Sequence, residues 1–170
     1  MKELYIDFDG VILDTIKVLY EYLDKEGIDP KSPSKEEEIK KVNFFKTLDW
    51  EHIVNTTPQI NDSINAIKKI LDSKRFLVAI LTHVTSLEEA VAKINYLRKY
   101  FKDITIIPVP KQISKTKMVH TEGAILIDDY SGNLIEWEEE GGIGVRFSTK
   151  LNGKGFKVID HLDQILDMEI

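Results

Sequence analysis

The chain has 170 residues, and 42% of them are hydrophobic, so it can bury one core with a modest insertion. Lys and Arg number 23 against 29 Asp and Glu, and the formal net charge of -6 argues against a nucleic-acid backbone as the main partner. Cysteine is absent, which excludes disulfides and thiolate metal sites.

The sequence carries no signal for export or for membrane insertion. Its beginning lacks a basic region followed by an apolar stretch and a small-residue cleavage site, and no apolar run approaches the roughly 18 residues that a membrane span requires. We therefore expect a cytoplasmic protein without membrane or nucleic-acid partners, and a homodimer is compatible with these properties.

Short apolar runs alternate with helical patterns along the chain. The runs are almost continuously apolar, which is typical of strands buried on both faces of a parallel sheet. They occupy residues 3–7, 76–81, 104–109, 124–128 and 143–147. Helices are expected at 86–100, 131–140 and 160–168. The alternation predicts an α/β fold, a Rossmann-like parallel sheet with helices on both faces.

The helix predicted at 86–100 shows an apolar periodicity of three and four residues. The residues in this register are Leu87, Ala90, Val91, Ile94, Leu97 and Phe101. We expect this face of the helix to pack against the sheet.

The interval between the first and second predicted strands is too long for a simple crossover. It spans about seventy residues, whereas a crossover with its helix needs only a dozen or more. Its composition is helical, with one pattern at 14–26 and another beginning after Ser34. We predict a small helical cap at 15–73, inserted after the first strand of a core that comprises 1–14 and 74–170.

Polar residues follow four of the predicted strands. In open parallel sheets the ligand site lies beyond the carboxyl ends of the strands, so these residues should meet at one edge. They are Asp7, Asp9 and Gly10 after the first strand, Thr82 and His83 after the second, Lys111, Lys115 and Lys117 after the third, and Asp128 and Asp129 at the fourth.

Four carboxylates at one sheet edge need a counter-charge. Like charges a few ångströms apart raise each other's pKa, so the group cannot stay ionised at neutral pH unaided. A hard divalent cation with oxygen ligands relieves this repulsion, and Mg²⁺ is the cation we expect. Carboxylates, a cation, a hydroxyl and a lysine together can handle a phosphoryl group.

These residues also carry a family resemblance. In chain order, DFDGV, the Thr82 of ILTH, a lysine and LIDDY resemble the four motifs of the haloacid dehalogenase (HAD) superfamily of phosphatases. The stretch LIDDYSGNLIEWEEEGGIGVRF resembles the 5'(3')-deoxyribonucleotidase family, especially its short bacterial and phage-type members, and FFKTL is similar to a phenylalanine pair of that family. The resemblance covers nearly the whole chain. It implies a Rossmann-like core with a small cap and Mg²⁺-dependent removal of phosphate from nucleoside monophosphates.

The arrangement permits an aspartyl-phosphate mechanism. Asp7 would attack phosphorus in line, and Asp9 would protonate the leaving oxygen and later take a proton from water. Mg²⁺ would lie between Asp7, the backbone carbonyl oxygen of Asp9, Asp128 and a phosphate oxygen, with Asp129 as a further support. In this interpretation Asp7, Asp9 and Asp128 are the metal residues.

The phosphate oxygens need donors of their own. The hydroxyl of Thr82 and the backbone N–H of His83 suit the non-bridging oxygens, and Gly10 lets the backbone approach closely. A lysine would neutralise the remaining charge. Lys115 follows Ser114, which is a candidate helix cap, and is our first choice; Lys117 is the second, and Lys111 is an outside option.

An aromatic group lies in the predicted cap. Phe44, Phe45 and Trp50 are more often the core of a cap than a platform for a nucleobase, although aromatic rings could stack on a base there.

The first hypothesis is a nucleotide phosphatase that prefers deoxyribonucleoside monophosphates. Alternatives are a phosphatase for sugar phosphates or other small metabolites, and a phosphotransferase that passes the phosphoryl group to an acceptor alcohol. A non-catalytic binding or regulatory protein is the outside alternative.

Overall fold

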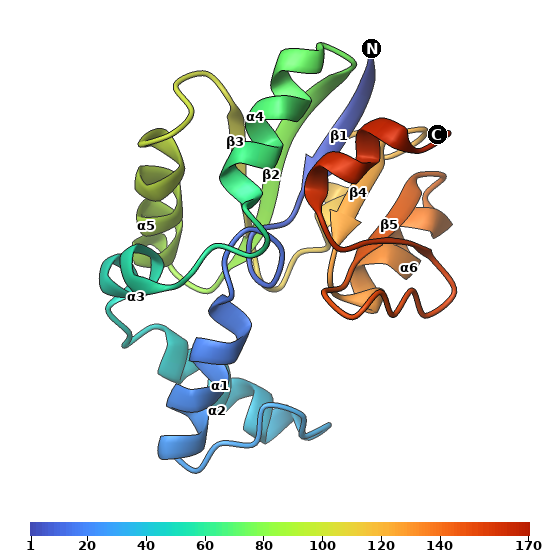
Figure 1. Cartoon of the computed structure of the whole chain (residues 1–170). Coiled ribbons are helices and arrows are strands. Elements are labelled where there is room, and N and C mark those ends of the chain that lie inside the picture. Colours follow the sequence, from blue (N-terminus) through green and yellow to red (C-terminus); the bar gives the residue numbers. More distant parts are fainter.

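A six-stranded, all-parallel sheet forms the centre of the computed structural model, which describes residues 1–170 (Figure 1). The strands lie in the order β3-β2-β1-β4-β5-β6, which confirms the predicted α/β fold with a parallel sheet. The strands are β1 (Lys2–Ile6), β2 (Phe76–Val84), β3 (Thr105–Pro110), β4 (Ile125–Asp128), β5 (Ile143–Phe147) and β6 (Lys157–Ile159).

Helices occupy most of the connections. None of them has both the length and the hydrophobicity needed to cross a bilayer. They are α1 (Thr15–Lys25), α2 (Lys35–Phe45), α3 (Trp50–Thr56), α4 (Ser63–Ser73), α5 (Leu87–Arg98), η1 (Lys115–Lys117), α6 (Ser131–Glu139) and η2 (Leu162–Asp167), of which η1 and η2 are 3-10 helices.

The strand order changes direction beside β1. From β1 the chain adds β2 and β3 on one side, and it then returns to add β4, β5 and β6 on the other. The crossovers therefore diverge between β1 and β4, and the carboxyl ends of these two strands border a crevice. This switch point is where open α/β sheets bind their ligands.

The sheet is covered on both faces because successive strand residues point to opposite sides. On one face, Leu4 and Ile6 belong to a core cluster that includes residues of α3, α4, α5 and η2. On the other face, Tyr5 belongs to a cluster with Leu134 and Trp137 of α6.

The long segment between β1 and β2 divides into two pairs of helices. In Figure 1, α1 and α2 extend away from the sheet, whereas α4 lies along it. Ile53 of α3, Ile67 of α4 and, from the start of the projecting pair, Leu19 of α1 lie in the same hydrophobic cluster as Leu4 of β1. No residue of α2 is fully buried, so α2 is the part of the segment least integrated into the core.

The last part of the chain differs from the sequence-based expectation. The helix expected at 160–168 is the 3-10 helix η2, and a short strand, β6, precedes it. Only three residues make up β6, with Val158 and Ile159 as its apolar members, so it gives almost no periodic signal.

The core membership of α4 can be tested by truncating one buried side chain. Ile67 is fully buried, so Ile67→Ala should lower the free energy of unfolding by about 2–5 kcal/mol. Ile39 on α2 is 61% exposed, and the matched change Ile39→Ala should cost no more than about 0.5 kcal/mol. Urea denaturation measures both values. Equal losses for the two variants would contradict this division of the segment.

Candidate active site

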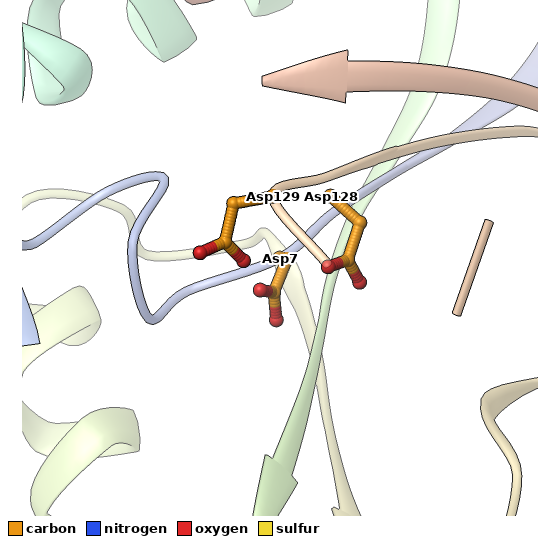
Figure 2. A group of neighbouring side chains, drawn as sticks. All are labelled: Asp7, Asp128 and Asp129. Atoms are coloured by element: carbon orange, nitrogen blue, oxygen red, sulfur yellow. The ribbon is translucent and has the colours of Figure 1, made fainter. Parts of the chain in front are cut away.

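Three carboxylates converge where β1 and β4 end. Asp7 directly follows β1, and its N–H donates to the carbonyl oxygen of Ile127 at 2.9 Å, which continues the pairing of the two strands. Asp128 is the last residue of β4, and Asp129 follows it. Figure 2 shows the three side chains directed toward one another, and one oxygen of each lies within 4.8 Å of the others.

One lysine bridges two of these carboxylates. Lys115 is buried, and its Nζ lies 2.8 Å from Oδ1 of Asp7 and 2.7 Å from Oδ2 of Asp128. Lys117 points outward and forms an exposed ion pair with Glu140 at 3.5 Å. Lys111 lines the cleft above the carboxylates. Of the three candidate lysines, Lys115 is the one in contact with the carboxylate group.

The hydrogen bonds of Asp128 fix its orientation. Its Oδ1 accepts from the backbone N–H of Tyr130 at 2.9 Å. Its Oδ2 accepts from Asn133 Nδ2 at 3.0 Å, in addition to Lys115. The first turn of α6 therefore holds this carboxylate in place.

Burial and mutual repulsion disfavour ionisation of the carboxylates. Burial, reinforced by the charge of Asp128, raises the pKa of Asp7 to about 7 although Lys115 opposes the shift. Burial and the charges of Asp7 and Asp128 raise the pKa of Asp129 to about 9. Burial disfavours the charged form of Lys115, but Asp128 and Asp7 outweigh it and raise the pKa of this lysine.

The carboxylate group fits a divalent cation. Its donors are hard oxygen atoms close enough to share one ion, which is the donor type that Mg²⁺ prefers. Lys115 alone neutralises only one of three negative charges, and the raised pKa values of Asp7 and Asp129 are the physical sign of that deficit. The carboxylate of Asp129 belongs to this group.

Gly10 makes room for Asp129. Its φ of +74° lies in the left-handed region, where an L side chain is strained. A Cβ at this position would come within 2.2 Å of Oδ2 of Asp129. The glycine of DFDGV is therefore required by a neighbouring carboxylate as well as by the turn.

The Asp9 carboxylate lies apart from the other three. Its Oδ1 accepts from the hydroxyl of Thr15 at 2.6 Å, and its Oδ2 accepts from Nζ of Lys93 at 2.7 Å. Both oxygens are thus held by neighbouring side chains. Asp9 still lines the same cleft as Asp7.

The end of β2 supplies Thr82 and His83. Thr82 is buried, and its hydroxyl accepts from Nζ of Lys93 at 3.1 Å. The ring of His83 is 2.8 Å from the carbonyl oxygen of Ile113, between Nε2 and O, and burial lowers the pKa of this histidine. His83 is therefore suited to contribute its backbone N–H to a ligand, and not a positively charged ring.

A cleft of about 650 Å³ lies above the carboxylates, between them and helices α1 and α2. Phe45 and Trp50 line it, together with Tyr20 of α1, whereas Phe44 does not. Trp50 is nearly buried, its Nε1 donates to the carbonyl oxygen of Phe45 at 2.8 Å, and its ring packs edge-on against that of Phe45. Trp50 therefore stabilises the wall of the cleft.

The sequence analysis missed Lys93 and Glu89, and it placed the buried face of α5 only partly right, with Ala90 and Leu97 buried as expected. Leu87 and Val91 are 81% and 54% exposed, whereas Glu89 and Lys93 are buried. Tyr96 and Leu97 complete the buried face. The missed signal was a Glu and a Lys at positions i and i+4 of a helix that begins just after Thr82, a spacing that permits an ion pair.

Solved structures share this fold. The chain matches a hydrolase from Pseudomonas syringae at 14% identity with a TM-score of 0.65, covering 98% of this chain and 97% of that one. It matches a haloacid dehalogenase-like hydrolase from Streptococcus pneumoniae at 13% identity with a TM-score of 0.66, again covering 98% and 97%. It matches a HAD-hydrolase from Bacillus subtilis, solved with bound magnesium, at 14% identity with a TM-score of 0.58, covering 98% and 97%.

These likenesses show that the chain has the HAD-like, Rossmann-type fold. No protein-family model matches the sequence, and no curated protein sequence matches it.

Magnesium ions should stabilise the protein, and more strongly as the pH rises. The pKa values of about 7 for Asp7 and about 9 for Asp129 lie above the ordinary value of 3.8, so the folded protein keeps protons that the unfolded chain releases. Stability without the cation therefore falls as the pH rises from about 4 through 9. With Mg²⁺ at one fixed concentration, about 100 times its Kd at pH 8, we expect the Tm to rise by about 5–10 °C near pH 8 and by less near pH 5, where protons compete for the carboxylates.

Scanning fluorimetry across this pH range checks the effect. Asp128→Asn should reduce the response to Mg²⁺, whereas Asp163→Asn, which alters a surface ion pair with Lys69, should preserve it. A Tm increase that is the same at both pH values, or the same in Asp128→Asn as in the unaltered protein, would contradict a cation site among these carboxylates.

Proposed function

We propose that the protein is a phosphomonoesterase that uses Asp7 as its nucleophile. The observation that carries the proposal is the position of the Asp7 carboxylate. It lies at the floor of the cleft, at the switch point of the sheet, beside a buried lysine and the carboxylates of Asp128 and Asp129. A carboxylate so placed can attack an electrophilic atom, and the positive charge around it attracts an anionic substrate. A phosphate ester is both electrophilic at phosphorus and anionic.

The first step is transfer of the phosphoryl group to Asp7. An oxygen of Asp7 forms a bond to phosphorus while the bond from phosphorus to the ester oxygen breaks. Asp9 gives a proton to the departing oxygen, so the product leaves as an alcohol. Asp9 is suited to this role because it lines the cleft but stands outside the carboxylate group at the end of β4.

The second step is hydrolysis of the aspartyl-phosphate. A water molecule attacks phosphorus, and Asp9, now ionised, takes a proton from it. The bond between phosphorus and the Asp7 oxygen breaks, which releases inorganic phosphate and restores both carboxyl groups to their starting states. One difficult displacement is thereby split into two easier ones.

The remaining groups stabilise charge on the phosphoryl oxygens. We assign the Thr82 hydroxyl and the His83 backbone N–H to the non-bridging oxygens, with the Gly10 turn close by. Lys115 holds Asp7 and Asp128 in place and adds positive charge where the substrate dianion arrives. Lys117 takes no part.

Mg²⁺ is the cofactor that fits the site. We propose that Asp7, Asp128 and the backbone carbonyl oxygen of Asp9 hold it, supported by Asp129, and the magnesium in the Bacillus subtilis structure is consistent with this assignment. When bound, the cation offsets the repulsion between the carboxylates and an anionic substrate and stabilises charge that develops on the phosphoryl group.

The substrate we favour is a nucleoside monophosphate, with deoxyribonucleotides first, as the resemblance to the deoxyribonucleotidases implies. The cleft has a volume of about 650 Å³, within the range of small-molecule sites. The aromatic rings of Tyr20 and Phe45 line it and offer apolar contacts to a base. We propose that α1 and α2 act as the cap that closes over the base and sugar.

A substrate panel tests the reaction and the specificity together. With Mg²⁺ present, we expect deoxyribonucleoside monophosphates such as dUMP and dTMP to give a kcat/KM at least about tenfold above that of sugar phosphates. Removal of Mg²⁺ with a chelator should abolish phosphate release. Asp7→Asn removes the nucleophile with almost no change in shape and should lower kcat by at least about 1,000-fold.

Each alternative gives a different outcome in this panel. A preference for sugar phosphates would replace the nucleotide assignment, and transfer of phosphate to an added alcohol in place of water would identify a phosphotransferase. Equal, slow phosphate release by the unaltered protein and by Asp7→Asn would contradict a catalytic role for the site.

The two lysines of η1 provide a matched comparison. Lys115→Met removes the ammonium that contacts Asp7 and Asp128, and we expect kcat/KM to fall by at least about 100-fold. Lys117→Met alters an exposed ion pair and should change kcat/KM by less than about twofold. Steady-state kinetics with the best substrate of the panel measures both values. A larger loss in Lys117→Met than in Lys115→Met would overturn the assignment.

A further inference from the structure

A second buried lysine, Lys93, reaches the site from the opposite side to Lys115. It lies on α5, its side chain is 0% exposed, and its Nζ is surrounded by oxygen atoms of three elements. The partners are Asp9 Oδ2 at 2.7 Å, Glu89 Oε2 at 2.6 Å, the carbonyl oxygen of His83 at 3.0 Å and Thr82 Oγ1 at 3.1 Å.

Burial of the Lys93 ammonium costs desolvation free energy, so the groups that compensate its charge indicate its role. An unpaired charge in a protein interior is strongly unfavourable, and a pair with Glu89 one helical turn away would already compensate it. The other three contacts all belong to residues at the carboxyl ends of β1 and β2, where the proposed acid/base and the proposed phosphate contacts lie. Lys93 thus connects α5 to both strand ends through one atom.

The Asp9 carboxylate depends on Lys93 for one of its two oxygens. Thr15 holds Oδ1 at 2.6 Å and Lys93 holds Oδ2 at 2.7 Å. Two directional contacts on opposite oxygens restrict rotation of the side chain about its bonds. Without Lys93, a carboxylate that must present its proton to one ester oxygen would keep only the contact from Thr15.

The Thr82 hydroxyl is directed by the same ammonium. Because Lys93 donates to Oγ1 of Thr82, that oxygen acts as an acceptor and its hydrogen is free to point elsewhere. Within the protein its acceptor is the carbonyl oxygen of His83 at 3.3 Å, which is a long contact. Lys93 also donates to this carbonyl oxygen. The hydroxyl hydrogen is therefore available to a phosphate oxygen.

We infer that Lys93 is a positioning residue whose main effect is to orient the acid/base Asp9, with a smaller effect, shared by all esters, on the phosphate-binding hydroxyl of Thr82. The inference rests on the proposed phosphatase function and assigns a role in it to a residue of α5. Lys93 itself does not touch the substrate. Glu89, whose Oε1 accepts from both the N–H and the hydroxyl of Thr85 at 2.8 Å, holds the ammonium between the two strand ends.

The dependence of rate on the leaving group tests this role. An alkoxide leaving group, as in dUMP, needs a proton from Asp9, whereas p-nitrophenolate leaves without one. The double variant Lys93→Met with Glu89→Gln removes the buried charges together and keeps the side-chain volumes similar. We expect the single-turnover rate with dUMP to fall by about 100-fold. With p-nitrophenyl phosphate we expect the rate of p-nitrophenolate release in a single turnover to fall by less than about fivefold. The aspartyl-phosphate should then accumulate, because its hydrolysis also needs Asp9.

A second comparison asks whether Lys93 acts through Asp9. In an Asp9→Asn background, the Lys93 substitution should lower kcat with dUMP by less than about threefold, because the group it positions is already lost. Lys99→Met, an exposed lysine next to the end of α5, is the control for a lysine change on this helix and should leave kcat unaltered.

The outcomes separate this inference from the function on which it depends. Equal losses with both esters, no loss in a folded variant, or a full further loss in the Asp9→Asn background would overturn the role of Lys93 and leave the phosphatase assignment standing. An unaltered protein that hydrolyses neither ester would overturn both. If circular dichroism shows that the double variant is unfolded, Lys93→Arg, which keeps the charge but not the compact ammonium, is measured by the same criteria.

Discussion

Charge balance at the carboxyl ends of β1 and β4 is the constraint on which the rest of the structure depends. The strand order forces Asp7 next to Asp128, and the chain adds Asp129 directly after it. Burial makes three neighbouring carboxylates unfavourable, and one lysine, Lys115, compensates only part of their charge. A bound cation would compensate the remaining negative charge and attract an anionic substrate, which is the physically consistent explanation for such a cluster. The cleft, the proposed cation site and the proposed nucleophile therefore follow from one arrangement of strands.

The two buried lysines divide the site into two functional halves. Lys115 serves the carboxylates that we assign to the nucleophile and to the cation, whereas Lys93 serves the acid/base Asp9. This separation matters because the two proposed aspartate roles make opposite demands. Asp7 must be ionised when it attacks, and Asp9 must carry a proton at the same moment. The surroundings of the two residues differ, because Lys115 contacts Asp7 whereas Lys93 and Thr15 contact Asp9.

Sequence patterns were sufficient for five of the six strands and for the residues at their ends, but not for the short strand β6 or for the helix that supports the site. Asp7, Asp9, Asp128 and Asp129 follow apolar runs, and topology alone brings such residues to one edge. Lys115 was preferred to Lys117 for its position after Ser114 and not for any periodicity, because a three-residue 3-10 helix has no periodic pattern. The geometry of this helix turns Lys115 inward and Lys117 outward. Lys93 and Glu89 were missed because a hydrophobic pattern assigns charged residues to the solvent face. In α5 a buried ion pair and three contacts to the site reverse that assignment.

The central claim is that phosphorus becomes bonded to Asp7 during turnover. The most direct measurement is acid quenching of the protein with its best phosphate ester, followed by borohydride reduction and peptide mass spectrometry. Borohydride converts an aspartyl-phosphate to homoserine, so the account predicts homoserine in place of aspartate at position 7 and unmodified aspartate at position 9. Phosphate release without homoserine at position 7, or with homoserine at another aspartate, would contradict it.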